Sequence, residues 1–159
     1  MGGLLRPFKE KRLKKLIYKH LIEREGCREV VYRDSLGHLT VGVGHLVTAD
    51  DSLCLGNKVS IERVQEFLEI DTEEAFRAAK EQAEEIGIDT EEFVLALTSV
   101  NFQLGTYWPH KFYEGYPLLV KGDWRGAIRK LNNTLWAKQT PVRVKDFTEA
   151  IEKAFKPHK

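Results

Sequence analysis

The chain of 159 residues is 42% hydrophobic and 31% charged, a composition typical of a globular protein with one compact domain or two small lobes that share a core. A formal net charge of +1 excludes a strong overall attraction to nucleic acid or to an anionic membrane. No apolar run reaches the roughly 18 residues of a membrane-spanning helix, and the N-terminus lacks the apolar core of a signal peptide. We therefore expect synthesis in the cytoplasm and no transmembrane segment.

The first predicted helix extends from about Lys9 to Glu25. Leu13, Ile17 and Leu21 recur at helical spacing and therefore lie in one row along a helix. Gly26 follows them and is typical of the residue that ends a helix. We expect an amphipathic helix whose last residue, Glu25, extends a buried apolar row.

A short hairpin is predicted next. Residues 28–33 are rich in residue types that favour strands, and residues 34–37 have the composition of a turn. Residues 38–43 alternate polar or small residues with Leu39, Val41 and Val43, which is typical of a half-buried strand. The two segments predict an antiparallel pair of strands of about six residues each.

A second helix is predicted to begin at Ser60, a favourable N-cap residue, and to continue to about Glu84. Gly87 is expected to end it. A helix of this length spans roughly 30 Å, which is enough to connect two lobes.

Helices are predicted for the remainder of the chain. Asp89, with Glu92 three residues later, is expected to cap a third helix that contains the apolar segment Phe93–Leu104. Asp123 and the pair Thr140-Pro141 mark two further helix starts, because proline is favoured at the first helical position. These elements predict an α+β fold, with a small antiparallel sheet beside a mostly helical body.

Glu25 is the first candidate for chemistry. Its expected place at the end of an apolar row removes part of its hydration, which disfavours the ionised form. The negative end of the helix dipole acts in the same direction. A carboxyl group that stays protonated near working pH is what a general acid requires. From position alone, an ordinary exposed glutamate at a helix end is the simpler interpretation.

Asp34 and Thr40 lie on the hairpin. Turn aspartates usually bond their own backbone, and a strand threonine is usually only a good strand former. However, Gly42 and Gly44 remove side chains beside Thr40, which allows a ligand to approach the backbone. Two carboxyl groups of unequal environment beside such a strand suit glycoside hydrolysis: one protonates the leaving oxygen and the other assists water.

The spacing of these residues resembles the active-site segment of the phage-type lysozyme family. Its signature is Glu, eight residues, Asp, five residues, Thr, and Glu25, Asp34 and Thr40 match it without a gap. The segment Thr40–Leu46 continues the match. Further matches are Asn101–Gly105, which resembles a cleft-lining helix end, and Trp136, Gln139-Thr140-Pro141 and Arg143, which resemble the start of the family's C-terminal helix. The resemblance covers about residues 14 to 156.

The resemblance implies one lysozyme-like domain. After a basic N-terminal extension (residues 1–13), an active-site lobe (residues 14–59) is joined by a connecting helix (residues 60–84) to a helical lobe (residues 85–159). The extension is expected either to be a solvated surface or to contact an anionic wall polymer or membrane.

The resemblance also implies roles. Glu25 would be the general acid, while Asp34 and Thr40 would position and activate water, with inversion at the anomeric carbon. Arg143 resembles the arginine that pairs with the family's catalytic glutamate and would favour its charged form, so the net effect on Glu25 stays open. The remaining matches are His45 and Asp71, expected to form a structural pair, Leu46 and Phe102 at sugar-contacting positions, and Gln103 as a lining residue of the cleft.

Some positions depart from the family pattern. Two sugar-contacting positions fall on Gly115 and Lys130, where the family has Ser and Asn, and the loop 48–59 is shorter than in T-even phage members. Cys27 and Cys54 are too few for a disulfide scaffold or a zinc site; two reduced thiols are expected, and a single bridge between them is the alternative.

The sequence therefore predicts a monomeric muramidase that binds a peptidoglycan glycan strand, acts at the cell wall after release or delivery, and needs no cofactor or metal. One alternative is a non-catalytic wall-binding module of a tail or secretion device. The other is a lytic transglycosylase, which forms an anhydro sugar without water; the presence of both Asp34 and Thr40 favours the hydrolase.

Overall fold

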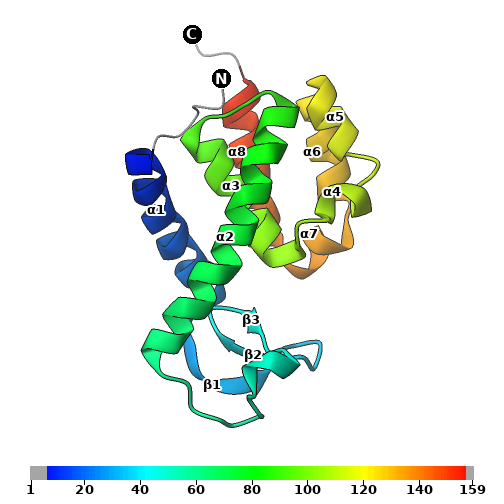
Figure 1. The fold of residues 1–159 in the computed structure, drawn as a ribbon. Helices are drawn as coiled ribbons and strands as arrows, with labels where there is room; N and C mark the ends of the chain where they lie inside the picture. The colour runs from blue at the N-terminus through cyan, green and yellow to red at the C-terminus, as the bar shows by residue number, and fades with distance from the viewer. Residues whose placement is uncertain (1–6, 157–159) are drawn as a thin grey trace. The chain divides into compact units, whose positions relative to one another are not determined.

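The computed structural model describes residues 7–156. As predicted, the fold is α+β, with three short strands after the first helix and helices thereafter (Figure 1). The strands are β1 (Arg28–Arg33), β2 (Leu39–Gly42) and β3 (His45–Leu46). The helices are α1 (Pro7–Glu25), α2 (Ile61–Ile86), α3 (Glu91–Leu104), α4 (Trp108–Lys111), α5 (Tyr116–Lys121), α6 (Trp124–Asn132), α7 (Leu135–Gln139) and α8 (Pro141–Phe155), with one 3-10 turn, η1 (Ala49–Asp51).

The chain forms two compact units. Residues 14–73, here called the sheet unit, include the three strands, η1 and parts of α1 and α2. Of the described residues, 7–13 and 74–156 form the helical unit. Both boundaries fall inside helices. Within residues 7–156, no helix combines the length and the apolar composition that a membrane span requires.

The predicted hairpin is confirmed in the sheet unit. β1 has the predicted bounds and pairs antiparallel with β2, with Tyr32 opposite Thr40. β2 is shorter than predicted because the chain turns at Gly42, whose φ of +65° favours glycine. β2 also pairs with β3, with Val41 opposite His45, so the strand order is β1-β2-β3. β3 was not predicted, because a strand of two residues is too short to show an alternation of polar and apolar residues.

The loop after η1 covers the other edge of β1. Backbone hydrogen bonds join the N–H of Val31 to the Asn57 carbonyl (2.9 Å), the N–H of Gly56 to the Val31 carbonyl (2.9 Å), and the N–H of Val59 to the Glu29 carbonyl (2.7 Å). A sheet edge left open would present unpaired backbone groups. The short loop therefore completes the sheet, which its sequence did not reveal.

Helix α2 has the start predicted for it. The Ser60 hydroxyl accepts a hydrogen bond from the N–H of Arg63 at 3.2 Å, which satisfies one free donor of the first turn. The helix ends at Ile86, slightly beyond the predicted Glu84. Gly87 ends it as predicted: its φ is +90°, and its N–H bonds the Ala83 carbonyl at 2.8 Å.

The predicted cap of α3 is wrong. Thr90, not Asp89, is the N-cap: its backbone is extended, and its hydroxyl accepts from the N–H of Phe93 at 3.3 Å. Both residue types can cap a helix, so composition could not decide between them. Because the helix begins at Glu91, the third helical residue is Phe93 rather than the expected Glu92.

The other two predicted starts are confirmed. The carboxylate of Asp123 accepts from the N–H of Gly126 at 3.1 Å at the start of α6, and Pro141 is the first residue of α8. Helices α4, α5 and α7 were not predicted. They have only 4 to 6 residues, too few for a helical repeat of apolar residues to appear.

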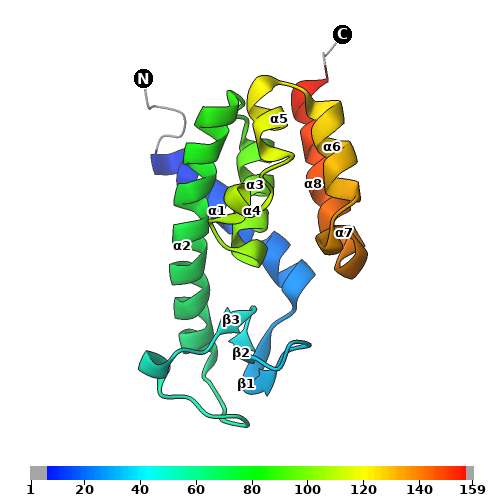
Figure 2. The same cartoon turned by 90° about the vertical axis from the view of Figure 1, so that its right-hand side faces the viewer.

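The core of the helical unit lies around α8, with α3 and α6 beside it (Figure 2). Phe147 of α8 is 1% exposed, and its ring meets that of Trp108 edge to face, with centroids 5.6 Å apart. Burial of each such aromatic side chain stabilises the fold by about 1.5–3 kcal/mol. Apolar packing therefore holds this unit together.

The predicted basic extension is not a separate element in the part that the structure describes; residues 1–6 lie outside it. From Pro7 onward the chain is already helix α1. Lys80 pairs with Glu10 at 2.8 Å, and one nitrogen of Arg12 lies 2.9 Å from both carboxylate oxygens of Glu91. Ion pairs near the surface contribute about 0–1 kcal/mol each, and these two join this segment to α2 and α3.

Candidate active site

Glu25 is the last residue of α1 and is half-buried. The row that leads to it is buried as expected, since Leu13, Ile17 and Leu21 are each 1% exposed or less. Gly26 follows with φ +76°, and its N–H bonds the Ile22 carbonyl at 2.9 Å. The apolar face of the helix therefore brings this carboxyl group to the edge of a core.

The turn between β2 and β3 meets the Glu25 side chain. A Cβ atom placed on Gly44 would lie 3.3 Å from Oε1 of Glu25. Gly44 also has a φ of +72°, which L side chains rarely adopt. The backbone conformation therefore favours glycine at this position, and any other side chain would also push against the Glu25 carboxyl group.

Asp34 has the turn role that its sequence position indicated. Its Oδ1 accepts from the N–H groups of Leu36 (2.9 Å) and His38 (2.8 Å). The bond from the His38 N–H is the main reason that the pKa of Asp34 lies below its ordinary value. Because its pKa is lowered and its side chain is partly exposed to water, Asp34 is ionised at neutral pH.

Thr40 lies on the central strand of the sheet, between Tyr32 and Leu46 in the register. Its hydroxyl donates to the His38 carbonyl at 3.0 Å, and the residue is 3% exposed. This bond fixes the direction of the hydroxyl group and leaves its oxygen free to accept. Leu46 is exposed, as a sugar-contacting residue would be.

His45 and Asp71 are in contact, with Nδ1 of His45 and Oδ2 of Asp71 2.7 Å apart. A second carboxylate, which sequence reasoning missed, lies on the other ring nitrogen: Oδ2 of Asp51 is 2.9 Å from Nε2. Burial lowers the pKa of His45, whereas the hydrogen bonds to Asp71 and Asp51 raise it. The two bonds together outweigh the burial, so the net shift of the pKa is upward. The signal available in the sequence was the Thr48-x-x-Asp51 spacing of a helix start.

Three predicted residues belong to the helical unit. Arg143 is 8% exposed and donates through Nη2 to the Ser99 carbonyl (3.1 Å) and hydroxyl (2.9 Å). Gln103 donates to the Thr140 hydroxyl at 3.1 Å, and Phe102 is half-buried. Their expected roles toward Glu25 and a sugar stay predictions.

The two departures from the family pattern have local explanations. A side chain at position 115 would overlap the ring of Phe112, so glycine is required there. Lys130 forms an ion pair with Glu114 at 3.0 Å. These contacts, with an aromatic ring and with a carboxylate, account for the two residues without reference to a sugar. Cys27 and Cys54 are both exposed and unbridged, as the preferred interpretation expected.

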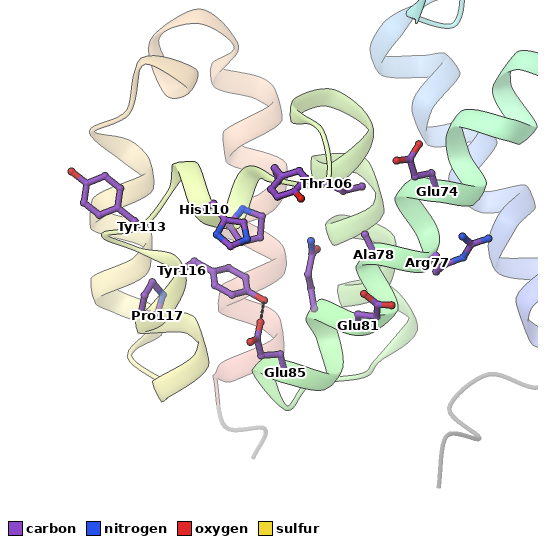
Figure 3. A pocket seen from close by; sticks show the side chains of 13 residues that line it. Glu74, Arg77, Ala78, Glu81, Glu85, Thr106, His110, Tyr113, Tyr116 and Pro117 are labelled. Carbon is purple, nitrogen blue, oxygen red and sulfur yellow. Dashed lines mark hydrogen bonds between the residues drawn. The ribbon is translucent and has the colours of Figure 1, made fainter.

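A groove of about 870 Å³ lies within the helical unit, between α2 on one side and α4 with the start of α5 on the other (Figure 3). Glu81 and Glu85 line the α2 side, and His110 and Tyr116 line the other. The Tyr116 hydroxyl donates to Glu85 at 2.5 Å, and burial together with this carboxylate raises the pKa of the tyrosine. No predicted catalytic residue lines this groove.

The small antiparallel sheet and the helices that follow it define a lysozyme-like α+β protein. The chain belongs to the phage lysozyme family, whose model matches residues 22–149. The match includes Glu25, Asp34 and Thr40 as well as Arg143. In the residues described, no group of three or more His, Cys, Asp or Glu side chains is arranged to hold a metal ion.

This chain covers most of one similar protein but only a small part of two others. The chain is 26% identical over 140 residues to the peptidoglycan hydrolase gp36 of Pseudomonas phage phiKMV, a match that covers 88% of this chain but 15% of that protein. It is 22% identical to a probable T4-type lysozyme 2 of Dictyostelium discoideum, over 75% of this chain and 83% of the relative. It is 26% identical to the pre-baseplate central spike protein Gp5 of Enterobacteria phage T4, over 80% of this chain and 26% of the relative.

Proposed function

We propose that this protein is a peptidoglycan hydrolase, a muramidase that cleaves the β-1,4 bond between N-acetylmuramic acid and N-acetylglucosamine. The observation that carries the proposal is the carboxyl group of Glu25 against the Gly44 backbone, in the same compact unit as the ionised Asp34. Membership of the phage lysozyme family and a relative named peptidoglycan hydrolase support the same substrate class.

In this proposal Glu25 is the general acid and donates its proton to the bridging oxygen as the glycosidic bond breaks. Asp34 and Thr40 position and activate the water that attacks the anomeric carbon from the opposite face, with inversion. The ionised state of Asp34 supports its part, because an acceptor-only carboxylate can take a proton from water. The Thr40 hydroxyl already donates to His38, so it would meet the water as an acceptor.

The remaining predicted roles belong to the same proposal. Leu46 and Phe102 would contact sugar rings, and Gln103 would line the cleft. Arg143 would stabilise the charge that Glu25 acquires once it has lost its proton. The enzyme would act as a monomer at the bacterial cell wall, reached by pore-dependent release or by delivery on a particle.

The decisive experiment compares purified wild type with Glu25→Gln in the clearing of a peptidoglycan suspension. We expect a loss of about a hundredfold or more, the usual scale for removal of a general acid. Glu23→Gln on the exposed side of the same helix is the matched control and keeps full activity. Full activity of the Glu25→Gln variant would end the proposal.

NMR of the first-formed anomer tests inversion, and mass spectrometry separates hydrolysis from the anhydro product of a transglycosylase.

A non-catalytic wall-binding module is the second candidate. One similar protein is a pre-baseplate central spike protein, and the match covers 26% of its length. This candidate predicts co-sedimentation with peptidoglycan and no release of reducing ends. The full set of Glu25, Asp34 and Thr40 favours the enzyme, since a binding module has no need of all three.

A further inference from the structure

His45 carries a carboxylate on each ring nitrogen. Asp71 lies 2.7 Å from Nδ1, and Asp51 lies 2.9 Å from Nε2. A neutral imidazole has a single N–H, whereas a carboxylate only accepts. Both contacts can be hydrogen bonds at the same time only while the ring carries two protons. The geometry therefore needs the imidazolium form of His45.

Asp51 joins three segments of the sheet unit. Its Oδ2 also accepts from the N–H of Thr48 at 2.8 Å, and its carbonyl accepts from Nη2 of Arg63 at 2.6 Å. The His45 ring stacks on Phe67 of α2, with centroids 3.9 Å apart and planes at 6°. The charged neighbours of this ring are thus Asp51 from η1 and Asp71 from α2, and the Arg63 guanidinium lies over the Phe67 ring, 5.2 Å from its centroid.

The turn that precedes His45 depends on such an anchor. Gly42 and Gly44 both have positive φ values, of 65° and 72°, and neither has a side chain to pack. Glycine leaves a backbone segment with the most freedom. His45 follows Gly44 directly, while Glu25, the titratable group on the α1 side, lies against Gly44 itself. The place of the turn beside the carboxyl group therefore depends on the contacts of His45, together with the β2–β3 pairing and the buried Val43 side chain.

We propose that Asp51 is a positioning residue of the hydrolysis: through His45 it holds the Gly42–Gly44 turn against the Glu25 carboxyl group. This inference rests on the proposed role of Glu25. With both bridges closed, the turn is tied to η1 and to α2. When His45 loses a proton, one carboxylate faces a ring lone pair, that bridge breaks, and the turn is held from one side only. Misplacement of a reacting group by about 1 Å can cost about a hundredfold in rate.

Asp51→Asn tests the inference, because asparagine keeps the shape but not the charge. Asp50→Asn is the matched control: Asp50 lies beside Asp51 in η1 and is exposed. NMR titration should show a lower pKa of His45 in Asp51→Asn than in wild type and no change in the control. We expect kcat to fall about threefold to tenfold with KM within about twofold, and the alkaline limb of the kcat profile to move to lower pH. Asp51→Glu, which restores the charge, should recover part of the loss.

A measurement on the wild type alone guards against a variant that folds poorly. The amide resonance of Gly44 should follow the titration of His45. The inference is overturned if the chemical shift of the Gly44 amide does not change as His45 titrates. It is also overturned if Asp51→Asn lowers the melting temperature while kcat and its pH profile stay unchanged. The clearing assay on Glu25→Gln tests the proposed function separately. The NMR titrations of His45 and Gly44 do not depend on the result of that assay.

Discussion

The two units hold their polar groups in different ways. In the sheet unit, carboxylates are fixed by donors: Asp34 accepts two backbone N–H groups, and Asp51 accepts one N–H and the His45 ring. In the helical unit, three glutamates of α2 (Glu74, Glu81 and Glu85) border an open groove, where Glu85 accepts a hydrogen bond from Tyr116. Hydrogen bonds thus hold Asp34 and Asp51 in fixed positions, whereas the three glutamates at the groove are exposed side chains.

The largest effect on stability is expected in the helical unit. Phe147→Ala should lower the free energy of unfolding by about 3–5 kcal/mol, because it leaves a cavity beside Trp108. Urea denaturation measures it. Val142→Ala on the same helix is the control: Val142 is 56% exposed, and its change should stay within about 0.5 kcal/mol. Equal losses in the two variants would contradict the account of the core.

Gly44→Ala separates backbone strain from the role of the site. The positive φ should cost about 1–2 kcal/mol of stability, and the added methyl group, 3.3 Å from Oε1 of Glu25, should displace that carboxyl group and reduce kcat about tenfold or more. Gly87→Ala is matched in strain, with φ +90° and no neighbour within 4 Å. It should lose similar stability and keep its activity. If the two variants lose activity equally, the contact has no catalytic meaning.

Tyr116→Phe removes the hydroxyl group that bonds Glu85 at the groove of the helical unit. The expected loss is about 1 kcal/mol, the net value of one hydrogen bond, with unchanged hydrolysis of peptidoglycan. Thermal denaturation and the clearing assay measure the two. A large loss of hydrolysis would show that this groove takes part in the reaction, and the contrast between the units would then fail.

The smallest effect is expected from pH. The pKa of His45 is raised above its ordinary value of 6.5, so its contribution to stability is complete below that value and is lost as the pH rises through the folded-state pKa. The melting temperature should therefore decline gently over this window. In Asp51→Asn the decline should be shallower, since the folded and unfolded pKa values are then closer. A wild-type melting temperature that rises across the same window would refute the assignment of charge to His45.

Local features of the chain were sufficient to predict much of the fold. The apolar row from Leu13 to Leu21, the Ser60 cap and the Pro141 start all act within one or two helical turns. The same is true of Asp34, whose turn bonds span at most four residues. The spacing of Glu25, Asp34 and Thr40 was sufficient to indicate the family, because it lies in a short continuous segment.

The local rules failed where two choices were equally good. Asp89 and Thr90 can both cap a helix, and the structure uses Thr90. Strand β3 and helices α4, α5 and α7 are too short to show a periodic pattern of apolar residues. Their formation therefore depends on packing against the longer elements around them.

By itself, the sequence determined the order of the main elements, the family and the identity of the candidate catalytic residues. Tertiary structure alone decided that Gly44 would meet the Glu25 carboxyl group and that Asp51 would share His45 with Asp71. The bond from His45 to Asp71 crosses 26 residues of chain. Such contacts depend on how a turn and a helix face pack in space, and no local propensity encodes that distance.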